Sequence, residues 1–242
     1  ILLKFFDKLI LDYPTSRSSH KKPIKSSGGI SFVLISTIHG LLSSNYFFSQ
    51  CLPLAIIGLL DDKFKIPSII RFLVQTVTIS ILFFYSNIFF YILNSQSLYY
   101  VFFSIFILGG IAMINFINFM DGLDGLIAGC MIVILLFISQ KTNTNLYILI
   151  GSLIGFIFYN WSPAKIFMGD IGSTFLGGVY AALIFRSENF SEVIEIIIPS
   201  APLLLDTISC ILRRYFNKQN IFTAHKLHLY QRLHQAGWSH RN

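Results

Sequence analysis

Residues 98–125 read LYYVFFSIFILGGIAMINFINFMDGLDG. The first part of this stretch, residues 98–117, contains no charged side chain and has the length of ~20 apolar residues that a membrane-spanning helix needs. Asn118, Asp121 and Asp124 follow directly where the apolar run ends. A carboxylate beside such a run is costly and indicates a functional site. The stretch therefore predicts a membrane helix with polar chemistry at one end.

The composition of the whole chain agrees with this reading. Hydrophobic residues make up 54% of the 242 residues and charged residues only 12%, whereas soluble proteins average roughly 25% charged residues. Intrinsic disorder is excluded because it requires low hydrophobicity and high charge. The net charge of +7 is explained by positively charged cytoplasmic loops and by attraction to anionic lipid, so we expect a bilayer and no nucleic acid as partner.

Apolar runs of this kind recur along the chain and predict an all-α, polytopic integral membrane helical bundle with about eight complete transmembrane helices. The expected spans are residues 29–44, 46–60, 71–88, 98–117, 124–140, 146–161, 171–186 and 193–212. We expect one transmembrane catalytic domain over 1–242. The chain begins at Ile1 and not at Met, so we expect a fragment of a protein with 10–11 spans that lacks N-terminal spans, and the presence of C-terminal spans is left open.

Lysine and arginine residues give the orientation of the bundle. If the spans alternate, fourteen of the 18 Lys and Arg residues fall on one side and two on the other, with Lys4 and Lys8 unassigned. This bias predicts that the rich side is cytoplasmic. The cytoplasmic loops are then residues 12–28, 61–70, 118–124, 161–170 and 213–242, and nearly all aspartates lie in or beside them. Asp206 is the exception, because it lies inside the last span.

Two aspartate pairs are the first candidates for chemistry. Asp61 and Asp62 directly follow five apolar residues, and two adjacent anions repel each other unless a cation or a proton relieves them. Asp121 and Asp124 are spaced i, i+3 with glycines after each, which allows a close approach to a ligand. The structural alternative for the first pair is a solvated helix end offset by Lys63 and Lys65; for the second pair it is a turn between two spans with Asp as helix caps.

Further polar groups lie on the same predicted face. Asp170 stands in the run Met168-Gly-Asp170-Ile-Gly-Ser173 and could also be a helix cap, and Asn160 precedes it. Cationic segments with serines and histidines occur near both ends of the chain and suit a phosphate group; their candidate residues are Arg17, Ser19, His20, Lys25, His225, His228 and Arg232. Carboxylates for a divalent metal and cations for phosphates are the equipment for phosphoryl transfer.

The motifs resemble those of the polyprenyl-phosphate N-acetylhexosamine-1-phosphate transferases of glycosyltransferase family 4. The family includes phospho-MurNAc-pentapeptide translocase and the enzymes that initiate O-antigen synthesis. Five motifs carry the resemblance, in the family's order: the loop from Arg17 to Gly29, Asp61-Asp62, Asn118 to Gly125, Asn160 to Ser173, and the histidine-containing tail. They cover nearly the whole chain.

The resemblance implies transfer of a HexNAc-type sugar 1-phosphate from a UDP-sugar to undecaprenyl phosphate, with release of UMP. It implies Mg²⁺ as cofactor, with Mn²⁺ as an alternative ion, at the cytoplasmic face of the bacterial inner membrane. The step would begin synthesis of O-antigen, capsule or another cell-envelope glycan. The partners are a UDP-N-acetylhexosamine donor, undecaprenyl phosphate and the bilayer, and a homodimer is left open.

The resemblance also assigns roles to single residues. Metal ligands would be Asp170 and Asp62; catalytic residues would be Asp61, Asp62 and His228. The nucleotide-sugar site would hold Asn118, Asp121, Asp124 and Asn160. Phosphate and lipid-phosphate contacts would come from Arg17, Ser19, His20, Lys25, His225 and Arg232.

The tail departs from the pattern of many relatives. Tyr230 and Gln231 stand at the later histidine positions, and His225 at the Asp position. This form looks more like the branch that initiates O-antigen or capsule chains than like the peptidoglycan enzyme. Transfer of phospho-MurNAc-pentapeptide remains an alternative reaction. An ion-coupled transporter or a membrane scaffold are alternatives of another class; a transporter predicts polar residues at the midplane of broken helices and an inverted repeat, which the sequence lacks.

Overall fold

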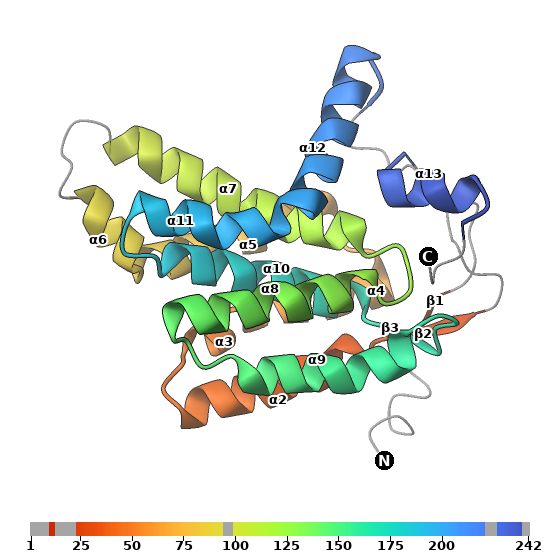
Figure 1. The fold of residues 1–242 in the computed structure, drawn as a ribbon, viewed down its shortest axis with the longest axis horizontal. Helices are drawn as coiled ribbons and strands as arrows, with labels where there is room; N and C mark the ends of the chain where they lie inside the picture. The colour runs from red at the N-terminus through yellow and green to blue at the C-terminus, as the bar shows by residue number, and fades with distance from the viewer. Residues whose placement is uncertain (1–9, 13–22, 94–98, 221–226, 239–242) are drawn as a thin grey trace.

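The computed structural model describes residues 10–12, 23–93, 99–220 and 227–238, and it is mostly helical (Figure 1). In chain order the helices are α2 (Gly29–Leu42), α3 (Phe47–Gln50), α4 (Leu52–Phe64), α5 (Ser68–Phe84), α6 (Asn87–Leu93), α7 (Tyr99–Met120), α8 (Leu126–Thr142), α9 (Tyr147–Asn160), α10 (Gly169–Phe185), α11 (Phe190–Ile197), the 3₁₀ turn η2 (Ile198–Ser200), α12 (Ala201–Phe216) and α13 (Leu229–Gln235). Each of the eight predicted spans contains a described helix.

The number of complete membrane spans is smaller than predicted. Within the described residues, two helices are long and apolar enough to cross a membrane: Tyr100–Met120 and Phe190–Phe216, which joins α11, η2 and α12. A third appears if α5 and α6, which are bent by 72°, form one broken span. The apolar helices α2, α8, α9 and α10 are shorter, with 10–17 residues. Eight complete spans are therefore not confirmed, because these helices are no longer than the short apolar runs that predicted them; α8, for example, has 17 residues.

A small sheet corrects the expectation of an all-α fold. Strands β1 (Leu11–Asp12), β2 (Ile24–Ser26) and β3 (Ile166–Phe167) form it in the order β1-β2-β3. The first pair is antiparallel and the second parallel, with Lys25 opposite Ile166. Strands of two or three residues are too short to produce a recognisable alternation of apolar and polar residues. The sheet ties the segment before α2 to the segment before α10.

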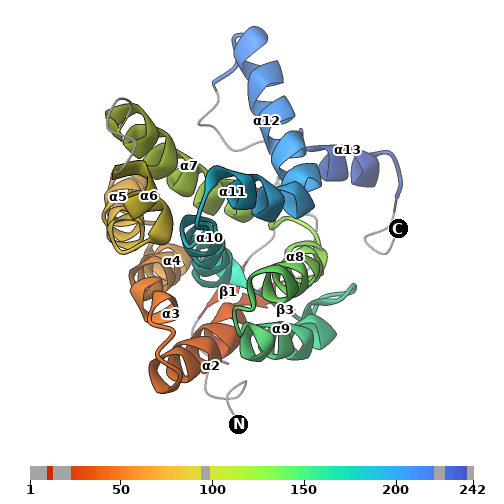
Figure 2. The ribbon, with the colours of Figure 1, turned by 60° about the vertical axis from the view of Figure 1, so that its left-hand side comes forward.

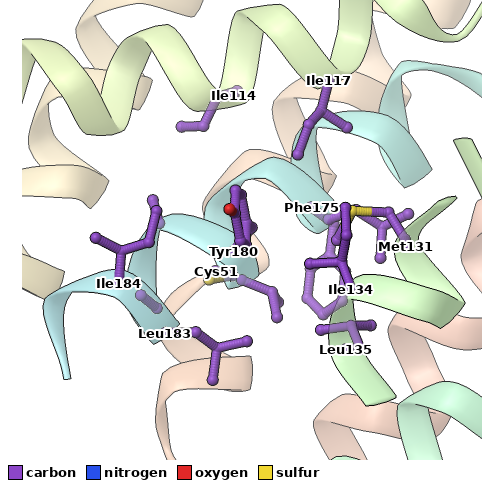
Figure 3. Close-up of a cluster of buried hydrophobic side chains, with 14 of the residues drawn as sticks. Cys51, Ile114, Ile117, Met131, Ile134, Leu135, Phe175, Tyr180, Leu183 and Ile184 are labelled. Carbon is purple, nitrogen blue, oxygen red and sulfur yellow. The ribbon is translucent and has the colours of Figure 1, made fainter. Parts of the chain in front are cut away.

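Helix α10 is the centre of the bundle. Every residue from Ile171 to Phe185 is buried, as expected for a helix that is apolar on all sides. The helix packs against α2, α4, α5 and α7, and Figure 2 shows it surrounded by its neighbours. Its Phe175 and Tyr180 lie in a cluster of buried side chains from several helices (Figure 3). A Cβ at Gly177 would lie 2.6 Å from the Cα of Ile114, so this glycine permits the close crossing of α7.

The polar motifs gather at one end of this bundle. The start of α10, the ends of α4, α7 and α9, and the small sheet all lie at the right-hand end in Figure 1. Residues that are far apart in the sequence therefore meet around the first turn of α10.

Candidate active site

Asp62, near the end of α4, holds the start of α10. Its Oδ1 accepts a hydrogen bond from the backbone N–H of Asp170 at 3.0 Å, and its Oδ2 accepts one from the N–H of Ile171 at 3.4 Å. N–H groups of a first helical turn lack partners within the helix and carry partial positive charge. Gly169 has a φ of +72°, and a side chain there would collide with the Asp62 carboxylate. The Gly-Asp sequence thus lets α4 meet α10 directly.

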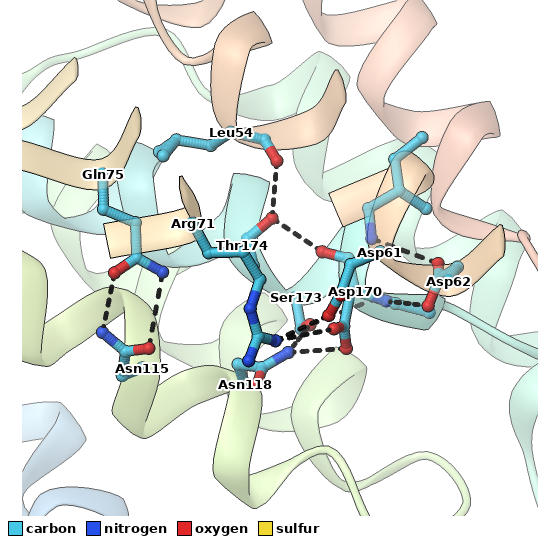
Figure 4. A network of polar contacts seen from close by, with 12 residues as sticks. Leu54, Asp61, Asp62, Arg71, Gln75, Asn115, Asn118, Asp170, Ser173 and Thr174 are labelled. Atoms are coloured by element: carbon cyan, nitrogen blue, oxygen red, sulfur yellow. Dashed lines mark hydrogen bonds and ion pairs between the residues drawn. The ribbon is translucent and has the colours of Figure 1, made fainter. Parts of the chain in front are cut away.

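Arg71, in the first turns of α5, bridges two of the predicted carboxylates. Its Nη1 lies 2.6 Å from Oδ2 of Asp61 and 3.7 Å from Oδ2 of Asp170 (Figure 4). The side chain of Asp61 is 12% exposed and that of Arg71 38%. A cation therefore lies between two carboxylates at a site that solvent can still reach.

Asn118, at the end of α7, completes this cluster. Its Nδ2 donates to Oδ1 of Asp170 and to Oγ of Ser173, both at 2.9 Å. The structure thus brings together four of the predicted site residues, Asp61, Asp62, Asn118 and Asp170, and adds Arg71 and Ser173. We refer to these six residues as the aspartate cluster.

The carboxylates of this cluster raise the pKa values of their neighbours. Burial, together with the neighbouring Asp170 carboxylate, raises the pKa of Asp62, although the two backbone hydrogen bonds lower it. Burial and the adjacent Asp61 raise the pKa of Asp170, whereas Asn118 and Arg71 lower it. The ionised carboxylates therefore repel one another, and a proton or a further cation would stabilise the cluster.

Asp121 lies in the loop after α7, beside the aspartate cluster. Burial and the charge of Asp170 raise the pKa of Asp121 to about 8. The predicted role of Asp121 in binding a nucleotide-sugar stays a prediction. The Asp170 carboxylate contributes to this shift because it repels a negative charge on Asp121.

Asn160 and Asp124, the other two predicted nucleotide-sugar residues, form hydrogen bonds that hold loops together. Asn160 is buried; its Oδ1 accepts from the N–H of Gly125 at 3.0 Å, and its Nδ2 donates to the carbonyl of Ile166 at 2.9 Å. Oδ2 of Asp124 accepts from the N–H of Ala164 at 3.0 Å. These contacts hold the loop after α7 against the segment that leads to α10. They support an indirect role in shaping the site, and direct contact with a donor stays a prediction.

The predicted phosphate-binding residues are placed only in part. Arg17, Ser19, His20 and His225 lie outside the described residues. Lys25 is half-buried in β2, and Arg232 is exposed on α13. Their roles stay predictions.

His228, the predicted catalytic histidine, is buried directly before α13. Its Nδ1 lies 3.6 Å from Oδ2 of Asp206. Burial lowers the pKa of His228, and the Asp206 carboxylate acts against that shift.

Sequence reasoning missed Arg71, which it used only to count positive charge. One pattern could have found it: Arg71 is a lone cation at the start of an apolar helix, ten residues after Asp61. A cation at a helix start opposes the helix dipole and therefore calls for an anionic partner.

The aspartate cluster offers oxygen ligands for a metal, but not a complete set. Within the part of the chain that the structure describes, no three His, Cys, Asp or Glu side chains are grouped to hold a metal ion. Mg²⁺ commonly takes one or two protein carboxylates and fills its other positions with water and substrate phosphates. Asp170 and Asp61 fit that chemistry. Asp62 fits it less well as a ligand, because both its oxygens already accept bonds from α10.

Comparison with known proteins places this site in a family. The protein-family model described as "Glycosyl transferase family 4" matches residues 45–188, a range that contains the whole aspartate cluster. The chain is 33% identical over 258 residues to a "Probable undecaprenyl-phosphate N-acetylglucosaminyl 1-phosphate transferase" of Bacillus subtilis, covering 96% of this chain and 71% of the relative.

Two further relatives are similar over shorter stretches. An "Undecaprenyl-phosphate alpha-N-acetylglucosaminyl 1-phosphate transferase" of Thermotoga maritima is 31% identical over 167 residues, or 69% of this chain and 53% of the relative. A "Phospho-N-acetylmuramoyl-pentapeptide-transferase" of Brachyspira hyodysenteriae is 34% identical over 110 residues, or 42% and 27%. The predicted resemblance is confirmed, and the chain belongs to glycosyl transferase family 4.

Proposed function

We propose that this chain transfers an N-acetylhexosamine 1-phosphate from a UDP-sugar to undecaprenyl phosphate and releases UMP. The observation that carries the proposal is the aspartate cluster, which is assembled from α4, α5, α7 and α10 at one end of an apolar bundle. N-acetylglucosamine is the favoured sugar, because the two relatives with that activity in their names align over 96% and 69% of the chain. The MurNAc-pentapeptide relative aligns over 42%.

In the proposed reaction an oxygen of the lipid phosphate attacks the β-phosphorus of the UDP-sugar. The bond between that phosphorus and the UMP oxygen breaks, and UMP leaves. A phosphate monoester is already mostly ionised at neutral pH, so a strong general base is not required. Catalysis then consists of positioning and charge neutralisation. Arg71 would neutralise phosphate charge, while Asp62 and Asn118 hold Asp170 in place.

The carboxylates of Asp170 and Asp61 would hold Mg²⁺. The bound ion would supply charge neutralisation at the pyrophosphate and the leaving UMP. The mutual repulsion of the carboxylates in the aspartate cluster supports this assignment, because a bound cation would relieve it.

The proposed setting is the bacterial inner membrane, with several crossings and the aspartate cluster on the cytoplasmic face. The bias of fourteen to two in lysine and arginine supports that orientation. Initiation of O-antigen or capsule synthesis is supported by the form of the tail, in which Tyr230 and Gln231 replace histidines.

Exchange of labelled UMP into UDP-N-acetylglucosamine tests the proposal in membranes that contain the chain. We expect exchange that requires Mg²⁺ and is lost in Asp170→Asn. A matched control is Glu195→Gln, which also neutralises a carboxylate but breaks only the 2.5 Å ion pair with Lys141 at the other end of the bundle. A chain that makes no lipid-linked product from any UDP-N-acetylhexosamine would refute the proposal.

A further inference from the structure

Asp206 is a carboxylate that the aspartate cluster does not use. It lies in α12, within the apolar segment Phe190–Phe216, and its side chain is 12% exposed. Ionisable residues in such segments are rare and normally have partners. The partners of Asp206 come from the C-terminal segment: its Oδ1 accepts from the N–H of Leu229 at 2.8 Å, and its Oδ2 lies 3.6 Å from Nδ1 of His228.

The Asp206 carboxylate therefore contacts both the first turn of α13 and the ring of His228. Leu229 is the first residue of α13, where a backbone N–H has no partner within the helix. The bond to Asp206 ties that first turn to α12. The other oxygen faces the ring of His228, whose side chain is only 4% exposed. The place of α13 and the setting of the His228 ring thus depend on the same group.

Tyr230 is a second anchor of α13. Its OH donates to the carbonyl of Phe119 at 3.2 Å, and a side chain at Gly122 would collide with that OH. Phe119, in the last turn of α7, and Gly122, in the loop after α7, lie on either side of Asp121. The rings of Tyr230 and His228 stack, with centroids 5.8 Å apart and planes 16° apart. The His228 ring therefore lies one ring away from this loop.

We propose that Asp206 and Tyr230 are positioning residues that hold His228 beside the loop after α7, a role that rests on the function proposed above. Asp206 contacts the His228 ring from α12, and Tyr230 stacks on that ring and links it to the end of α7. Tyr230 can do so because its side chain reaches the backbone carbonyl of Phe119 over a glycine, Gly122.

Chemical modification tests this placement without any need for activity. The full chain in detergent is treated with diethylpyrocarbonate, and mass spectrometry follows the modification of His228, with the half-buried His39 of α2 as internal reference. We expect a several-fold faster modification of His228 in Asp206→Ala and no change at His39. A His228 that stays as protected in Asp206→Ala as in the unaltered chain would overturn the proposal.

Steady-state kinetics test whether Asp206 acts through His228. Asp206→Asn keeps an oxygen for the N–H of Leu229 but removes the negative charge that faces His228. We expect kcat to fall between about 10-fold and 100-fold, as for a misplaced group, and His228→Gln to abolish any further effect of Asp206→Asn. Losses that simply multiply in the double variant would overturn the proposal. Glu195→Gln is the control and should leave kcat unchanged.

Rescue at Tyr230 separates positioning from loss of fold. Tyr230→Ala should raise KM for UDP-N-acetylglucosamine, and Tyr230→Phe should restore part of the loss because its ring still stacks on His228 although the hydrogen bond to Phe119 is gone. Failure of Tyr230→Phe to improve on Tyr230→Ala would contradict the proposed anchor. If the unaltered chain forms no lipid-linked product, the proposed function fails, while the modification experiment still decides whether Asp206 places His228.

Discussion

Gly58 lies where α4 crosses the start of α10, and replacing it with alanine should damage the aspartate cluster without touching any of its side chains. A Cβ at this position would lie 2.5 Å from the carbonyl carbon and oxygen of Asp170 and 2.6 Å from the nitrogen of Ile171. All three are backbone atoms, which cannot rotate away as the end of a side chain can. The two helices must therefore separate.

The size of the separation follows from the contacts. An ordinary van der Waals contact of a Cβ begins at 3.4 Å, so the backbones must move apart by about 0.9 Å from the present 2.5 Å. The hydrogen bond from the N–H of Asp170 to Asp62, now 3.0 Å, would lengthen to about 3.9 Å and would be lost. A misplacement of ~1 Å can reduce the rate of an enzyme by about 100-fold. We expect a loss of that size in kcat/KM.

Stability should fall as well, since overpacking costs about 1–3 kcal/mol, whereas glycine to alanine in an open helix gains about 1 kcal/mol. Gly151→Ala is the matched control, because a Cβ there would meet no described atom within 4 Å. The assays are UMP exchange and thermal unfolding of the detergent-solubilised chain. If Gly58→Ala exchanged UMP as fast as Gly151→Ala, the close crossing of α4 and α10 would not be what organises the aspartate cluster.

Three further predictions concern single polar groups. Arg71→Ala removes the cation between two carboxylates and should lower kcat/KM by at least about tenfold, with partial recovery in Arg71→Lys, measured by UMP exchange. Gln75 and Asn115 exchange side-chain hydrogen bonds of 3.4 and 2.9 Å between α5 and α7. Replacing either residue with Leu should lower the stability of the chain by about 0.6–1.7 kcal/mol. In thermal unfolding, the double Leu variant should lose no more stability than the less stable single variant. Burial and Asp170 raise the pKa of Asp121 from 3.8 to about 8. Between these pH values the folded chain binds a proton that the unfolded chain lacks, so the free energy of unfolding should fall as pH rises from about 4 to about 8. Asp121→Asn should weaken this pH dependence in melting curves, and an unchanged pH dependence would contradict the assignment.

Much of the aspartate cluster could be predicted because its members sit at the ends of apolar runs. Alternating spans place the end of one run and the start of the next on the same face. Asp61, Asn118 and Asp170 are therefore expected at one end of the bundle; there a hydrogen bond joins Asn118 to Asp170, and Arg71 links Asp61 to Asp170. Helix positions were predictable for the same reason, since apolar runs are the strongest pattern in this chain.

Contacts between separate elements could not be predicted. Nothing in the local pattern around Asp206 indicates that its partners are 22 and 23 residues away, at His228 and Leu229. The pairing of Gln75 with Asn115 likewise depends on how α5 packs against α7. The role of Asn160 at the donor site stays a prediction, but the two backbone groups that its buried amide binds could not be foreseen, because only the arrangement of the loops brings them there.

Mass spectrometry of lipid-linked products tests the central claim most directly. The purified chain is offered undecaprenyl phosphate and Mg²⁺ with UDP-N-acetylglucosamine, other UDP-sugars or UDP-MurNAc-pentapeptide. We predict undecaprenyl diphosphate N-acetylglucosamine and UMP in equal amounts from the unaltered chain, and neither product from Asp170→Asn. Equal product from Asp170→Asn, or no lipid-linked product from any donor, would contradict the claim that the aspartate cluster is the centre of a sugar-1-phosphate transferase.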